Sequence, residues 1–133
     1  MGKTNSNSTG DVIFTATGSG SFSFTSDPWA ASPTLNYSYE VVGNTITLNI
    51  ASGHAANTNS SVAADTDVFI PAAYRPSATQ YILISAPINN VQSIARADIQ
   101  TTGFISYHPY NANVYTTGQV NTGFYVHTLS WNF

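Results

Sequence analysis

The chain has 133 residues, 7% of them charged, and its formal net charge is −3, with Lys3, Arg75 and Arg96 as its cations. This balance excludes a basic surface able to neutralise several phosphates, so neither nucleic acid nor an anionic membrane is expected as a partner. No apolar run approaches the roughly 20 residues that insert across a bilayer, and the lack of cysteine excludes a disulfide framework. The polar residues are mostly Thr, Ser and Asn, which is typical of an extracellular or virion-exposed β protein with surface buried between subunits.

The length favours a single domain that begins after a polar leader. Residues 1–10 are rich in Ser, Asn, Thr and Gly, which predicts a flexible leader, or the end of a truncated shaft, outside a domain at 11–133. Residues 11–16 are expected to begin the first strand. The glycines of residues 18–20 then predict a turn.

The clearest pattern in the sequence lies at residues 35–50. Apolar and polar side chains alternate with a period of two on both sides of residues 43–44, which predicts an antiparallel hairpin with one buried face. The preceding loop carries Trp29, whose ring either folds back over the edge of the core or stays exposed as a contact residue. Residues 51–64 contain few apolar side chains and are expected to form a surface connection.

An apolar triplet and a proline-rich corner stand at the centre of the chain. Residues 68–70 predict a strand, residues 71–76 a tight corner, and residues 81–84 the next strand. Arg75 in the corner is expected to donate hydrogen bonds to backbone carbonyl groups.

Residues 94–107 predict a second hairpin, whose loop includes Gly103. Arg96 and Asp98 alternate on one face of its first strand, so they are expected to pair with each other or across a subunit boundary. Residues 108–113 are expected to form the next loop.

The final segment, residues 123–133, is apolar on both of its alternating faces. A strand covered on both sides in an all-β chain of this size must lie between two layers or against a neighbouring subunit. Many short strands with regular turns, and no helical periodicity, predict an all-β fold, an antiparallel β-sandwich of jelly-roll type.

No catalytic motif is present in the sequence. His54, His108 and His127 lack the spacing of a zinc site, and Asp65 with Asp67 does not by itself make a calcium loop. No Gly-x-Ser-x-Gly elbow occurs, and the six carboxylates contain no pair marked out for glycoside hydrolysis. We therefore expect no enzyme activity, no cofactor and no metal.

The order of strands and turns resembles a known family. The segments GNTITLNI, VFIPAAYRPSATQYILIS and IARADIQTTGFISYHP, followed by a closing aromatic strand, are similar to the head domains of bacteriophage tail fibres and receptor-binding proteins, and to related viral fibre knobs. The resemblance covers residues 35–133 and rests on Pro71, Ala72, Tyr74, Arg75 and Pro76 of the corner, and on Ile99, Gly103 and Ile105. It implies a jelly-roll-like fibre head assembled as a homotrimer. The candidates for the trimer interface are Phe124, Tyr125, Val126, Leu129 and Trp131.

A binding function is favoured over catalysis. Neutral sugars are held by aromatic faces, with Asn, Asp and His side chains supplying directional hydrogen bonds at the rim. The candidate ligand contacts are Trp29, Tyr107, His108, Tyr110, Asn111 and Asn113. The alternative is that Tyr107 and Tyr115 are strand-core residues and that the loop between them is merely polar.

The resemblance implies a receptor-binding head at the tip of a viral or phage fibre, on the virion surface and acting outside the cell. Such a head attaches the particle to a glycan or protein receptor on the host cell. Two other interpretations stay open: a structural or assembly module of a virion or appendage without a ligand of its own, and a soluble lectin-like trimeric sandwich.

Overall fold

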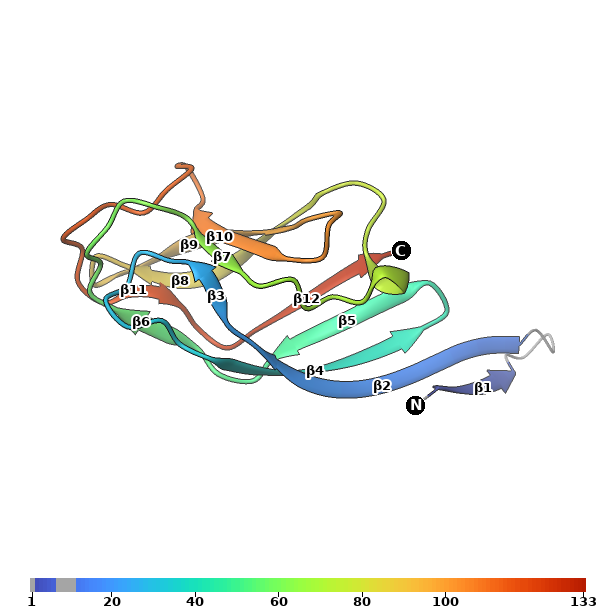
Figure 1. The fold of residues 1–133 in the computed structure, drawn as a ribbon. Helices are drawn as coiled ribbons and strands as arrows, with labels where there is room; N and C mark the ends of the chain where they lie inside the picture. The colour runs from blue at the N-terminus through green and yellow to red at the C-terminus, as the bar shows by residue number, and fades with distance from the viewer. Residues whose placement is uncertain (1, 7–11) are drawn as a thin grey trace.

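Two five-stranded antiparallel sheets pack face to face in the computed structural model, which describes residues 2–6 and 12–133 (Figure 1). The predicted antiparallel β-sandwich is therefore confirmed. The first sheet contains, in spatial order, β1 (Gly2–Ser6), β2 (Val12–Phe22), β4 (Leu35–Val42), β5 (Thr45–Ile50) and β12 (His127–Asn132). The second contains β3 (Phe24–Ser26), β7 (Ala64–Thr66), β10 (Ile105–Pro109), β9 (Val91–Ile99) and β8 (Gln80–Ile88). A short pair is formed by β6 (His54–Ala56) and β11 (Thr122–Phe124).

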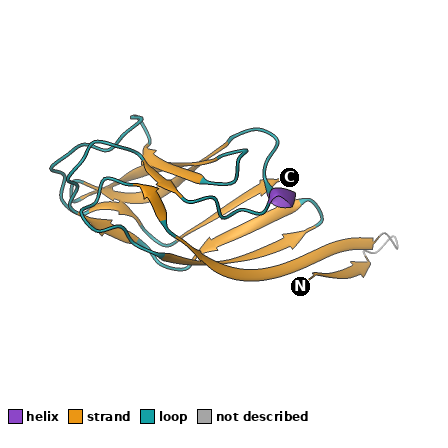
Figure 2. Ribbon diagram, in the orientation of Figure 1, coloured by secondary structure: helices purple, strands orange, loops and turns teal. Residues whose placement is uncertain are grey.

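Most of the loop length lies at the end of the sandwich away from the β1–β2 pair (Figure 2). The single helical element in the described part of the chain is the 3₁₀ turn η1 (Ala72–Tyr74). Among residues 2–6 and 12–133 there is thus no helix with the length and apolar character needed to span a membrane.

The predicted hairpin at residues 35–50 is confirmed as β4 and β5. Val42 pairs with Thr45 across a two-residue turn, in which Gly43 takes a φ of +61° that favours glycine. Val41 and Leu48 point into the core, whereas the outward positions carry mostly polar residues, with Glu40 and the exposed Val42 among them. On that outer face, Thr45 donates to Asn132 at 2.8 Å and Thr128 donates to Asn49 at 2.9 Å.

The turn expected at residues 18–20 is wrong, because β2 runs straight through these glycines. Gly18 pairs with Tyr39 and Gly20 pairs with Tyr37 on the neighbouring strand. A Cβ atom at Gly18 would lie 2.6 Å from ring atoms of Tyr39, and one at Gly20 would lie 2.6 Å from the hydroxyl oxygen of Tyr37. Glycine therefore leaves room for two tyrosine rings to lie across the strand, instead of bending it.

The beginning of the chain also differs from the expectation that residues 1–10 lie outside the fold. Gly2–Ser6 forms β1 and pairs antiparallel with β2, from Gly2 opposite Ala16 to Ser6 opposite Val12. The rest of the expected leader, residues 1 and 7–10, lies outside the described residues, as does Asp11.

The central corner is held by backbone hydrogen bonds rather than by a strand at residues 68–70. The amides of Phe69 and Ile70 both donate to the carbonyl oxygen of Gly103 at 3.1 Å. Arg75 Nε donates to the carbonyl oxygen of Ile70 at 2.9 Å, so its predicted role is confirmed. Gly103 has a φ of +96°, and a Cβ atom there would contact both Arg75 and Ile70, so this position requires glycine.

The final segment is not one strand covered on both faces. It is divided at Tyr125 and Val126 into β11, which pairs with β6, and β12, which pairs with β5 in the first sheet. Both alternating faces are apolar because the two halves face the core from different layers. Leu129 and Trp131 point inwards from β12, and the alternating residues Thr128, Ser130 and Asn132 are exposed.

Candidate functional site

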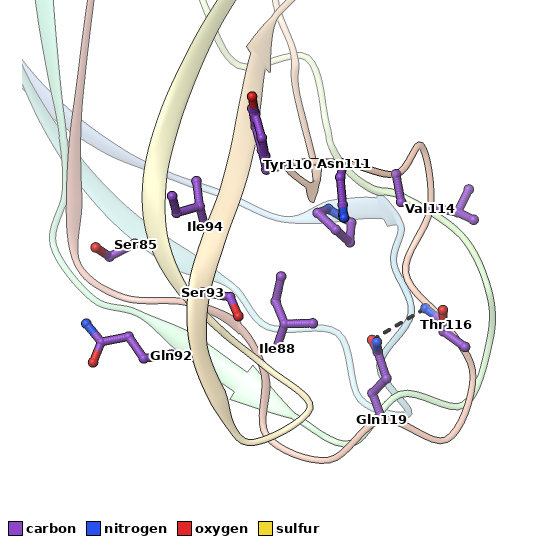
Figure 3. A pocket seen from close by; sticks show the side chains of 12 residues that line it. Ser85, Ile88, Gln92, Ser93, Ile94, Tyr110, Asn111, Val114, Thr116 and Gln119 are labelled. Atoms are coloured by element: carbon purple, nitrogen blue, oxygen red, sulfur yellow. Dashed lines mark hydrogen bonds between the residues drawn. The ribbon is translucent and has the colours of Figure 1, made fainter.

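An open hollow of about 690 Å³ lies between the β8–β9 hairpin and the segment at residues 109–119, and we name it the hairpin groove (Figure 3). Side chains from both sides surround it. Its lining residues are Ser85, Ile88, Gln92, Ser93, Ile94, Pro109, Tyr110, Asn111, Ala112, Val114, Thr116 and Gln119.

One wall of the groove is the β8–β9 hairpin. Ile88 pairs with Val91 across a turn in which Asn89 and Asn90 have φ values of 50° and 62°. Asparagine tolerates this left-handed conformation, and two such residues make the tight turn that suits a twisted hairpin. The strands therefore stay regular up to the turn, and Ile94 stays on the outer face of the second sheet, with 49% of its surface exposed.

The opposite wall is irregular in backbone, but it is fixed to the rest of the sandwich. Tyr115 is fully buried, and its amide donates to the carbonyl oxygen of Val62 at 3.0 Å. The amide of Gln119 donates to the buried hydroxyl of Thr58 at 2.9 Å. The amide of Val120 donates to the side chain of Asn89 at 3.2 Å, which joins this wall to the tip of the hairpin.

The groove combines apolar side chains with neutral polar groups and contains no charged residue. Ile94 and Tyr110 supply the most exposed apolar surface, and 56% of Tyr110 is accessible. The side-chain amides of Gln92 and Asn111 make no hydrogen bond to any of the described residues. The groove can therefore offer both donors and acceptors to a neutral ligand that also has an apolar face.

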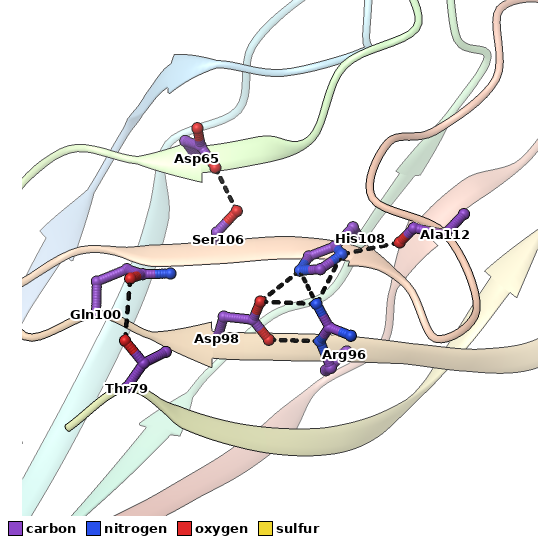
Figure 4. Close-up of polar contacts among 8 residues, drawn as sticks. All are labelled: Asp65, Thr79, Arg96, Asp98, Gln100, Ser106, His108 and Ala112. Atoms are coloured by element: carbon purple, nitrogen blue, oxygen red, sulfur yellow. Dashed lines mark hydrogen bonds and ion pairs between the residues drawn. The ribbon is translucent and has the colours of Figure 1, made fainter.

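A network of the half-buried Arg96 with the buried Asp98 and His108 lies on the outer face of the second sheet, next to the groove (Figure 4). Arg96 donates to Asp98 through Nε at 2.7 Å, which confirms one of the two pairings expected from the sequence. This hydrogen bond raises the pKa of Arg96. His108 Nε2 lies 2.6 Å from Asp98 Oδ2, and His108 Nδ1 lies 2.9 Å from the carbonyl oxygen of Ala112 in the groove wall.

Two of the six predicted ligand contacts, Tyr110 and Asn111, line the groove. Asn113 is exposed in the same loop without lining it, and His108 is buried beneath it. The other two contacts lie in the core. Trp29 is 4% exposed and donates from Nε1 to the carbonyl oxygen of Thr122 at 2.7 Å, so its ring is folded over the core.

Tyr107 is fully buried as well, and its ring stacks on Phe124 with centroids 4.6 Å apart. Its hydroxyl donates to His127 Nε2 at 2.8 Å, and burial raises its pKa. Trp29 and Tyr107 therefore have no surface with which to contact a ligand. Tyr115 is buried too, so the alternative that Tyr107 and Tyr115 are core residues is the one that the structure supports.

The residues expected at the trimer interface also include both buried and exposed side chains. Phe124, Leu129 and Trp131 are buried inside a single chain, so they contribute to its own core and cannot contact another subunit without leaving it. Tyr125 and Val126 remain exposed at the crossing between β11 and β12, and 64% of Val126 is accessible. They border a shallow hollow with Gly53, His54, Ala55 and Phe124.

The hairpin side of the groove was not predicted. Ile88, Gln92 and Ile94 have the pattern of an ordinary strand, although one signal was available. Arg96 and Asp98 alternate on an outward face, and Ile94 lies two residues earlier on the same face, where an isoleucine has no core to contact.

His108 and the neighbouring Ser106 are not arranged as a general base and its nucleophile. Both ring nitrogens of His108 face oxygen acceptors, so it has none free to activate a hydroxyl group. The hydroxyl of the neighbouring Ser106 donates to Asp65. No group of three or more His, Cys, Asp or Glu side chains suited to a metal ion occurs within the described ranges.

No protein-family model matches this chain, and no curated protein matches it either.

Proposed function

We propose that this chain is a receptor-binding fibre head that attaches a viral or phage particle to the host-cell surface through the hairpin groove, without catalysis. The observation that carries this proposal is the groove itself, which is open, uncharged and lined by exposed apolar and amide groups. Its wall includes Tyr110 and Asn111 of the loop in which the sequence predicts ligand contacts.

The chemistry of the groove favours a neutral saccharide over a charged receptor. An acidic sugar or peptide needs a cationic partner, but Arg96, the cation on the lining strand β9, already binds Asp98 through two nitrogens. The ring of Tyr110 and the side chain of Ile94 can cover the C–H face of a sugar. The amides of Gln92, Asn111 and Gln119 can bond its hydroxyl groups.

The fibre-head part of the proposal, including the homotrimer and the position at a fibre tip, rests on the resemblance of the corner and its following hairpin. The confirmed β-sandwich and the exposed Tyr125 and Val126 agree with it. Light scattering on the purified chain is the direct test: a mass three times that of the 14.2 kDa chain supports the trimer, and a monomer contradicts it.

Binding is tested by presenting the purified chain to an array of immobilised neutral, sialylated and sulfated glycans. Ile94→Ala and Tyr110→Ala alter the groove. Val91→Ala is the matched control, because Val91 is an exposed β-branched residue on the same strand that does not line the groove. Loss of the Tyr110 ring is expected to weaken binding about fivefold or more, since an aromatic contact contributes about 1 kcal/mol.

We expect neutral glycans to bind, both groove variants to weaken the interaction, and Val91→Ala to leave it unchanged. Binding confined to sialylated or sulfated glycans would contradict the ligand class. Binding that survives both groove variants would move the site elsewhere, and an array without any signal would favour a structural module.

A further inference from the structure

His108 sits beneath the groove wall without lining the groove. It pairs with Arg96 on β9, and its ring lies between two acceptors on different elements: Asp98 of β9, at 2.6 Å from Nε2, and the carbonyl oxygen of Ala112, at 2.9 Å from Nδ1. Ala112 lines the groove between Asn111 and Val114. His108 thus connects the outer face of the second sheet to the loop that forms one wall.

Both contacts are within hydrogen-bond distance, and neither acceptor oxygen carries a proton when Asp98 is ionised. A neutral imidazole carries one N–H group, so it can satisfy one acceptor and must turn a lone pair towards the other. An imidazolium carries two N–H groups and satisfies both. The geometry therefore fits the doubly protonated ring, held by a charge-assisted hydrogen bond on the carboxylate side.

The charged groups around His108 have to be considered together. On β9, Asp98 favours the positive ring, whereas a terminal guanidinium nitrogen of Arg96 lies 3.1 Å from His108 Nε2 and 3.4 Å from Nδ1 and opposes it. Two groups from other strands affect the His108 ring only through an intervening residue. Tyr81 on β8 lies with its ring centroid 5.2 Å from the guanidinium carbon of Arg96, and Asp65 on β7 binds Ser106.

We propose that His108 is a positioning residue for the hairpin groove: its doubly protonated ring fastens the Ala112 loop to Asp98 and so holds the ligand-binding wall in place. When the ring loses a proton, the remaining N–H stays with the carboxylate, because that hydrogen bond is the stronger one. The bond to Ala112 is then lost. The groove wall should loosen as the pH rises, and its ligand should bind more weakly. Only this last consequence rests on the proposed function.

The wild-type chain provides the first test, in a pH series from about pH 5 to about pH 8. Long-range ¹H–¹⁵N spectra of the His108 ring should show two protonated nitrogens at the acidic end. Hydrogen exchange, corrected for intrinsic rates, should show the amides of Tyr110 and Ala112 losing protection about tenfold as the pH rises, as expected for one lost hydrogen bond to a charged donor. The amides of Ala97 and Ile99 should not follow.

The variant His108→Gln retains a donor for one acceptor only, so it should remove the pH dependence of protection at Tyr110 and Ala112. Ser106→Ala is the matched control, since it removes a hydrogen bond on the same strand and face without touching the loop. If the array identifies a glycan, its affinity should fall about tenfold in His108→Gln and stay unchanged in Ser106→Ala.

Several results would overturn the assignment. One is a single neutral tautomer of His108 at the acidic end, and another is loop protection that does not change with pH. A third is a His108→Gln chain that behaves like Ser106→Ala. The spectra and exchange rates require no ligand, so failure of the proposed function on the array would leave this result standing. If His108→Gln does not fold, the wild-type pH profile decides the question alone.

Discussion

A substitution at Leu129 tests whether this residue belongs to the core of a single chain or to an interface between subunits. Its side chain is fully buried within the chain, opposite Leu48 on β5. Leu129→Ala removes three carbon atoms, and at about 0.8 kcal/mol each their transfer accounts for about 2.4 kcal/mol. The cavity left behind adds to this, so we expect the free energy of unfolding to fall by about 3 kcal/mol.

Urea denaturation at several chain concentrations measures this loss. With an m-value of about 2 kcal/mol per molar urea, the midpoint should fall by about 1.5 M. The difference between variant and wild type should stay constant over a hundredfold range of concentration, and light scattering should give both chains the same mass. Val126→Ala is the control at an exposed position of the same segment, and it should change stability by less than about 0.5 kcal/mol. A stability loss in Leu129→Ala that grows on dilution, or a variant that dissociates while wild type does not, would refute the assignment to the core.

Two further predictions concern stability. Burial lowers the pKa of His127 and of His54, so as the pH falls the unfolded chain binds protons before the folded chain does. The melting temperature should therefore fall as the pH falls below about 6.5. A scan from about pH 7.5 to about pH 5.5 checks this, and a constant melting temperature would contradict it. Gly18→Ala should destabilise the fold by about 1 kcal/mol, because the added Cβ atom would displace the Tyr39 ring, although alanine is ordinarily the better strand residue. In a Tyr39→Ala background the same change should be neutral or stabilising. Equal effects in the two backgrounds would contradict this explanation.

Local patterns predicted the parts of the fold that are formed locally. The hairpins β4–β5 and β9–β10 have their alternation and their turn within a short stretch of sequence, so both were found. The glycines of β2 were misjudged because their reason lies on another strand, where Tyr37 and Tyr39 cover them. No glycine or proline marks the division of the last segment at Tyr125 and Val126, so the sequence alone could not predict it.

The candidate site was predicted only on its loop side, for the same physical reason. A loop rich in Tyr, Asn and His suggests binding, but its sequence does not determine which rings turn inwards. Tyr107 lies at an inward position of β10, and Tyr110, three residues later, is exposed beyond the end of that strand. The hairpin side depends on which face of β9 is outward, and that is decided by the packing of the second sheet against the first.

The crossing at Tyr125 and Val126 has a kinetic consequence. The same short segment supplies β11 to the β6 pair and β12 to the first sheet, and Thr122 accepts the hydrogen bond from Trp29, 93 residues earlier in the chain. The β4–β5 and β8–β9 hairpins can form early, but the first sheet and the β6–β11 pair are incomplete until residues 122–132 arrive. Closing loops of this length costs conformational entropy before the long-range contacts form and offset that cost. We therefore expect the chain to be among the domains that fold in milliseconds to seconds. Until that segment docks, the outer edge of β5 remains unpaired and open to another chain.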